Sequence, residues 1–123
     1  RAFNKHLEET QEHVKRLMQV FESLEMRPSP QKCMIMEELL REGKGIIEET
    51  RNAPAFEALL IAAAQKVEHY EISAYGTLCA WAQCMGYQEA KDLLDKTLQE
   101  EKDTDLRLSE LSYAGINEGA IAE

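Results

Sequence analysis

The scarcity of helix-breaking residues most constrains what this chain can fold into. Only three prolines and six glycines interrupt 123 residues, and no stretch alternates apolar and polar residues as a strand does. Because proline and glycine interrupt or end helices, their positions predict helices over about residues 2–25, 30–50, 54–85 and 87–113. Ser29 is the predicted N-cap of the second helix with Pro30 as its first residue, and Gly86 is predicted to end the third. The pattern predicts one all-α domain over residues 1–113, an antiparallel helix bundle with short loops, and a tail over 114–123.

Apolar stripes with steps of three and four residues support the bundle. The first helix carries Phe3, Leu7, Thr10, Val14, Leu17, Phe21 and Leu24. The third carries Phe56, Leu60, Ala63, Val67, Glu71, Ala74, Leu78, Trp81 and Met85. The fourth carries Ala90, Leu94, Leu98, Glu101, Asp105 and Leu108. The second helix contains Gly43 and Gly45, which weaken a helix interior, so we expect it to be a crossover element.

The charge and cysteine content narrow the classes of partner and site. Fourteen basic residues against twenty-three acidic ones give a net charge of −9. This charge repels phosphate backbones and anionic lipids, so we expect neither nucleic acid nor membrane as partners. No apolar run approaches the roughly 18 residues of a membrane-spanning helix. The three cysteines match no zinc spacing, and we expect buried, reduced thiols in a cytoplasmic protein.

Carboxylates interrupt the stripes where an unpaired charge is costly. Glu71 lies within the third stripe, Glu101 and Asp105 lie within the fourth, and Glu68 is one turn before Glu71 on the adjoining row. We predict that Glu71 and Glu101 face inward near the same level. Buried carboxylates shift their pKa, pair with a base or bind a cation, and oxygen ligands with one or two imidazoles suit iron or manganese.

Ordinary structural roles remain open for these residues. Glu68 alone can be a solvated surface residue, and His6 and His13, on one edge of the first stripe, can be partly buried histidines. His69 points away from the Glu71 row. The Glu-x-x-His motif of di-iron bundles does not occur, although Glu68 and Glu71 keep its spacing. The sequence also lacks a phosphate-binding loop and a nucleophile elbow, which disfavours hydrolase and transferase chemistry.

Several stretches carry a resemblance that runs in order over almost the whole chain. They are His6–Thr10, Ala62–Ile72, Tyr75–Leu78, Thr97–Leu98, Glu100–Lys102 and Asp105. They closely resemble the YciF/YciE-type ferritin-like proteins, a bacterial family associated with stress responses. The resemblance implies a ferritin-like antiparallel bundle with one additional helix, a cytoplasmic location and a homodimer. The family's usual first helix, which bears a Glu, falls before Arg1, so we expect a bundle that lacks this helix.

The resemblance also implies a metal site. Carried over by position, Glu9, Glu68, Glu71 and Glu101 are the expected ligands, with His6 and Asp105 as secondary candidates. The first functional hypothesis is a carboxylate-bridged di-metal centre of iron or manganese that acts on O₂ or peroxide. The alternative is a non-catalytic helical bundle that serves oligomerisation or interaction and has no functional metal site.

Overall fold

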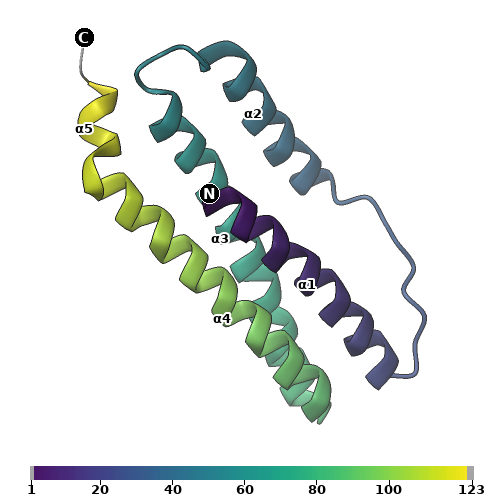
Figure 1. Ribbon diagram of the computed structural model, residues 1–123. Coiled ribbons are helices and arrows are strands. Elements are labelled where there is room, and N and C mark those ends of the chain that lie inside the picture. Colours follow the sequence, from purple (N-terminus) through teal and green to yellow (C-terminus); the bar gives the residue numbers. More distant parts are fainter. Residues whose placement is uncertain (1, 122–123) are drawn as a thin grey trace. The chain divides into compact units, whose positions relative to one another are not determined.

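The computed structural model describes residues 2–121 and confirms the all-α prediction (Figure 1). Its elements are α1 (Ala2–Ser23), α2 (Met34–Thr50), α3 (Phe56–Cys84), α4 (Gln88–Leu111), a π-helical turn η1 (Ser112–Ile116) and α5 (Asn117–Ala120). No strand occurs among the described residues. Within the same residues, no helix has both the length and the apolar character needed to cross a membrane.

Two helices end in the same left-handed turn. At the end of α3, Gly86 has φ +76°, its N–H bonds the carbonyl of Gln83, and the Tyr87 N–H reaches back to Ala82. This pair of bonds is a Schellman motif, and Gly86 therefore ends the helix as predicted. After α1, Glu25 adopts φ +55°, and the N–H groups of Glu25 and Met26 bond Glu22 and Phe21 in the same pattern.

The predicted start of α2 at Pro30 is wrong. The helix begins at Met34, and Cys33 is its N-cap: the Cys33 Sγ accepts a hydrogen bond from the Met36 N–H. The Tyr70 hydroxyl lies 3.0 Å from the same sulfur, so tertiary contact favours the cap at Cys33. The cysteine prediction is also partly wrong, because all three cysteines are free but only Cys79 is buried, while Cys33 and Cys84 are exposed.

The chain divides into two compact units, and their boundary crosses α3 and α4 within unbroken helices. The first unit holds the chain up to Pro30 together with Glu71–Thr104, and the second holds Gln31–Tyr70 and the chain from Asp105 onward. In the first unit, α1 and α4 run in opposite directions (Figure 1), since His13 contacts Glu100 and Arg16 contacts Thr97. The turn at Gly86 makes α3 and α4 antiparallel as well, so α1 and α3 run parallel.

The first unit has an apolar core near the turn between α3 and α4. Its buried members are Val20, Cys79, Ala82, Ala90 and Leu94. Ala90 and Leu94 confirm the stripe predicted for α4, but the core differs from the stripes predicted for α1 and α3, because Leu7 and Trp81 are each 58% exposed. On α1 the buried row is the one that contains His13 and Val20, and on α3 it is the row that adjoins the predicted stripe. Both helices carry apolar residues on a second face, and only packing selects the face that is buried.

The second unit contains α2 and the parts of α3 and α4 that belong to it. Ile61, Ala63 and Leu108 are buried in this unit, whereas α2 has no buried residue. An ion pair of 2.7 Å between Lys66 and Glu42 joins α3 to α2. The contact between Cys33 and Tyr70 joins the same two helices at the start of α2.

The two left-handed turns predict opposite effects of glycine. Gly86→Ala should lower the free energy of unfolding by about 1 kcal/mol, because a Cβ is unfavourable at positive φ. Glu25→Gly should raise it by about 0.5–1 kcal/mol, since the glycine relieves the same strain at some cost in chain entropy. Urea denaturation of both variants measures the two values. If both substitutions changed the free energy of unfolding in the same direction, this account of the turns would be wrong.

Candidate metal centre

Two carboxylates face each other inside the first unit. Glu101 on α4 is completely buried, and Glu71 on α3 is partly buried. One oxygen of each side chain lies within 4.8 Å of the other. Both carboxylates therefore face inward at the same level, as the two interrupted stripes predicted.

Glu68, in the part of α3 that belongs to the second unit, is another predicted ligand. It precedes Glu71 by three residues on an unbroken helix, so the two side chains lie on the same side of α3 one turn apart. Glu68 is only 2% exposed. Glu68 is therefore a buried residue, and a solvated position is excluded for it. Glu68 belongs to the second unit, so its role as a ligand stays a prediction. We call Glu71 and Glu101, which both belong to the first unit, the acidic cluster.

A buried histidine lies beside Glu101. His13 on α1 is 4% exposed, and both of its ring nitrogens meet carboxylates: Nδ1 lies 2.9 Å from Glu101 Oε1 and Nε2 lies 2.8 Å from Glu100 Oε2. Arg16 donates from Nη1 to Glu100 Oε2 at 2.8 Å and to the buried Thr97 hydroxyl at 2.7 Å. His13 is thus held on both sides, and Arg16 in turn orients Glu100.

The electrostatics of the first unit follow from this arrangement. Burial, followed by the hydrogen bond and the charge of Glu101, raises the pKa of Glu71 to about 8, although His13 and His6 act in the opposite direction. Burial disfavours charge on His13, but its hydrogen bonds to Glu101 and Glu100 outweigh this effect and raise its pKa. Burial and the charges of Glu71 and Glu101 raise the pKa of Tyr75 to about 12. Glu71 is therefore largely protonated at neutral pH, and the proton limits the repulsion between the two carboxylates.

Two other predicted ligands lie on α1 at the margin of this arrangement. Glu9 accepts a hydrogen bond of 3.3 Å from the Thr104 hydroxyl, and Thr104 follows Glu101 by three residues on α4. His6 lies 4.0 Å from Glu9 through Nδ1 and is close enough to Glu71 to lower its pKa. The structure thus places Glu9 and His6 near the carboxylate pair but not in the group of oxygens within 4.8 Å.

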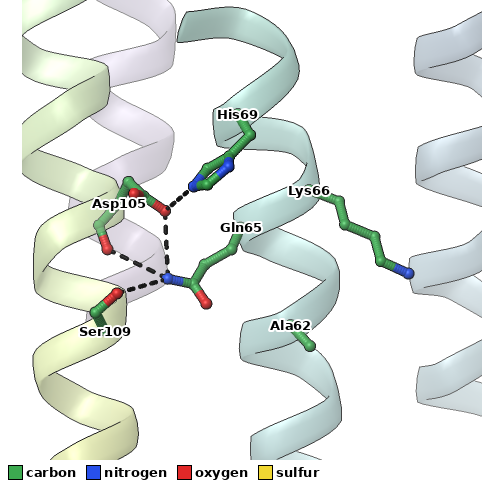
Figure 2. A pocket seen from close by; sticks show the side chains of 6 residues that line it. All are labelled: Ala62, Gln65, Lys66, His69, Asp105 and Ser109. Carbon is green, nitrogen blue, oxygen red and sulfur yellow. Dashed lines mark hydrogen bonds and ion pairs between the residues drawn. The ribbon is translucent and has the colours of Figure 1, made fainter.

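Asp105 belongs to a different environment, in the second unit. Its carboxylate accepts a hydrogen bond from Gln65 Nε2 at 3.2 Å and lies 3.0 Å from His69 Nε2. Figure 2 shows these side chains in a hollow, which is lined by Ala62, Gln65, Lys66, His69, Asp105 and Ser109. Asp105 is therefore engaged by neighbours from α3 and is not a member of the acidic cluster.

The sequence did not predict the α4 residues that contact α1 next to Glu101, which are Thr97, Glu100 and Thr104. Glu100 reads as a solvated helix surface, and the threonines at positions 97 and 104 are not apolar, yet both threonines are buried. A signal was present, because Ala90, Leu94, Thr97, Glu101, Thr104 and Leu108 continue the steps of four and three when threonine is counted as a core residue. On α1, His13 lies on the row that is buried, together with Val20.

The raised pKa of Glu71 predicts how stability depends on pH in the metal-free protein. Between about pH 5 and pH 8 the folded state keeps a proton that an unfolded glutamate, with its ordinary pKa of 4.5, has released. The free energy of unfolding should therefore fall as the pH rises through this range. Glu71→Gln removes this contribution and should stabilise the metal-free protein by about 1–3 kcal/mol near pH 7, with little effect near pH 5.

Urea denaturation in the presence of a chelator at several pH values measures this difference. Glu110→Gln changes an exposed carboxylate on α4 and is the matched control, for which we expect no comparable gain. If Glu71→Gln destabilised the metal-free protein near pH 7, Glu71 would instead be the partner of a base.

Comparisons with known proteins agree with the geometry of the fold. Residues 1–121 match the family described as a domain of unknown function, DUF892. Protein YciF of Escherichia coli is 47% identical over 120 residues, which cover 97% of this chain and 72% of that protein. The crystal structure of the E. coli stress protein YciF superposes with a TM-score of 0.89 over 94% of this chain and 74% of that one. The structure of YcfI from Rhodopseudomonas palustris, 39% identical, gives a TM-score of 0.83 over 88% of this chain and 69% of that one. The chain belongs to the DUF892 family, which confirms the resemblance that the sequence stretches carry.

Proposed function

We propose that the acidic cluster binds iron or manganese in a carboxylate-bridged di-metal centre of the ferritin-like kind. The observation that carries this proposal is the inward-facing pair Glu71 and Glu101, with the buried His13 beside Glu101. A proton on Glu71 limits the repulsion when no cation is bound. Glu71 and Glu101 would hold a divalent cation in place of that proton, because carboxylate oxygens are the ligands that such an ion prefers.

The chain's own contribution is to hold the carboxylates and to keep water away from them. Burial of Glu101 lowers the local dielectric constant and strengthens its attraction for a cation. When bound, iron or manganese supplies redox chemistry toward O₂ or peroxide. Because the E. coli relative is a stress protein, we infer that this protein also acts in a bacterial stress response and that it is cytoplasmic.

Metal analysis tests this function directly. We expect the purified protein to bind Fe²⁺ under anaerobic conditions, or Mn²⁺, in stoichiometric amount, and the bound ion should raise the melting temperature. Glu71→Gln should weaken binding by at least about tenfold, because an amide is a poorer ligand than a carboxylate. Its effects on metal-free stability and on metal affinity then have opposite signs, which separates a ligand from a partner in a structural salt bridge.

Glu110→Gln is again the control and should bind metal like the unmodified protein. Asp105→Asn tests the secondary candidate: because Asp105 lies with Gln65 and His69, we expect little change in affinity. The proposal fails if the unmodified protein binds no stoichiometric metal, or if Glu71→Gln binds it equally well.

A separate observation favours self-association. Among the exposed apolar residues of the first unit, Leu7, Val14 and Met18 lie on one row of α1, and Trp81 and Met85 lie at the end of α3; each has more than half of its surface exposed. Exposed apolar rows of this kind are typical of interfaces. We infer that the protein forms a homodimer or a higher oligomer through these residues. Self-association is also what the alternative function, a non-catalytic interaction protein, requires.

Light scattering tests the association. The unmodified protein should elute as a dimer or larger species, and Trp81→Lys should shift it toward the monomer without loss of helical content, since Trp81 is 58% exposed and its replacement leaves the core intact. Tyr113→Lys, at an exposed aromatic residue in η1 of the second unit, serves as the control. A monomeric unmodified protein would rule out this association.

A further inference from the structure

His13 is the buried group whose surroundings are least explained by packing alone. A histidine that only filled space in a bundle would need one hydrogen-bond partner, but here both ring nitrogens are engaged, at 2.9 Å and 2.8 Å, by two different carboxylates. One of these carboxylates, Glu101, belongs to the acidic cluster, and the other, Glu100, does not. The two nitrogens therefore differ in role: Nδ1 faces the cluster and Nε2 faces away from it.

The contacts of His13 Nε2 resemble those that orient a metal-binding histidine. Histidines that bind metals almost always donate their other ring N–H to a carboxylate or carbonyl, which sets the tautomer and the orientation of the ring. Glu100 accepts from Nε2, and Arg16 holds Glu100 with Nη1 at 2.8 Å and Nη2 at 3.3 Å. Arg16 is itself fixed by the buried hydroxyl of Thr97. This chain of contacts keeps the proton on Nε2 and leaves Nδ1 as the atom that meets the cluster.

The distance between His13 Nδ1 and Glu101 Oε1 is the distance expected for two ligands of one cation. Two ligand atoms bound about 2.1 Å from one octahedral ion are about 3.0 Å apart when they occupy adjacent positions. The observed separation of Nδ1 and Glu101 Oε1 is 2.9 Å. A cation can thus contact both atoms without a change in their spacing.

We propose that His13 is the imidazole ligand of the metal centre, binding through Nδ1 next to Glu101, with Glu100 as the residue that positions it. This inference rests on the proposed function of the acidic cluster. It replaces His6, the histidine that the resemblance implied, which is more exposed and whose Nδ1 lies 4.0 Å from Glu9. Binding would release the proton of Nδ1 to solvent and use the nitrogen lone pair for the bond to the cation, while Nε2 keeps its proton toward Glu100.

Cobalt(II) alone is a suitable probe, because it is paramagnetic and replaces iron and manganese at oxygen and nitrogen ligands. In the proton NMR spectrum of the Co²⁺-loaded protein, the Nε2–H of a bound imidazole gives a strongly shifted signal that disappears in D₂O. We expect one such signal in the unmodified protein. It should be lost in His13→Gln, with the dissociation constant for Co²⁺ raised by at least about tenfold.

Two histidine substitutions are matched controls. His69→Gln changes the exposed partner of Asp105 in the second unit, and His6→Gln removes the rival ligand; both should keep the shifted signal. Glu100→Gln retains His13 and an oxygen acceptor for Nε2–H, so the signal should persist at a changed position while the dissociation constant rises about tenfold. This variant also decides the matter if His13→Gln does not fold.

The outcomes separate the two proposals. If the unmodified protein binds Co²⁺ but lacks the exchangeable signal, or if His13→Gln retains it, His13 is not a ligand while the carboxylate centre still stands. An unchanged affinity and spectrum in Glu100→Gln would likewise overturn the positioning role and the inference with it. If the unmodified protein binds no Co²⁺, both the proposed function and the role of His13 are wrong.

Discussion

The proximity of Glu71 and Glu101 is the constraint on which the rest of the first unit depends. Two carboxylates cannot both be charged in a buried space without compensation, and the pKa of about 8 for Glu71 reflects this cost. Two features of the structure reduce this cost. His13 brings a positive charge to Glu101, and the proton on Glu71 removes a negative one. A bound cation would compensate both carboxylates at once, which is why the metal-free protein is expected to be less stable than it could be.

This constraint also accounts for the polar residues within an otherwise apolar bundle. The apolar core is concentrated near the turn between α3 and α4, where Val20 packs with Cys79, Ala82, Ala90 and Leu94. Further along α4, the buried positions are occupied by Thr97, Glu101 and Thr104. The Thr97 hydroxyl accepts from Arg16 and the Thr104 hydroxyl donates to Glu9, so hydrogen bonds that apolar side chains could not make hold the polar layer together. The unit thus combines an apolar layer that provides stability with a polar layer that contains the buried carboxylate of Glu101.

The contrast between Asp105 and Glu101 illustrates how one helix serves two environments. They are four residues apart on α4, and sequence reasoning placed them in one stripe. Glu101 is buried beside His13, whereas Asp105 is engaged by Gln65 and His69 at an open hollow in the second unit. Four residues along the same helix therefore separate a carboxylate that is completely buried from one that is bonded by the side chains at an open hollow.

The sequence by itself determined the helices and the presence of buried acids, because both depend on local chemistry. Gly86 ends α3 through its own freedom at positive φ, and acids within apolar rows identify Glu71 and Glu101 whatever the partners are. The tertiary structure decided which face of each helix is buried. Helix α3 is apolar on more than one side, so Trp81 and Ala82 are equally suited to a core, and only packing against α1 and α4 buries Ala82 and leaves Trp81 exposed. It also decided that Cys33 caps α2, and it brought His13 and Glu100 together across 87 residues of sequence, a contact that no local pattern encodes.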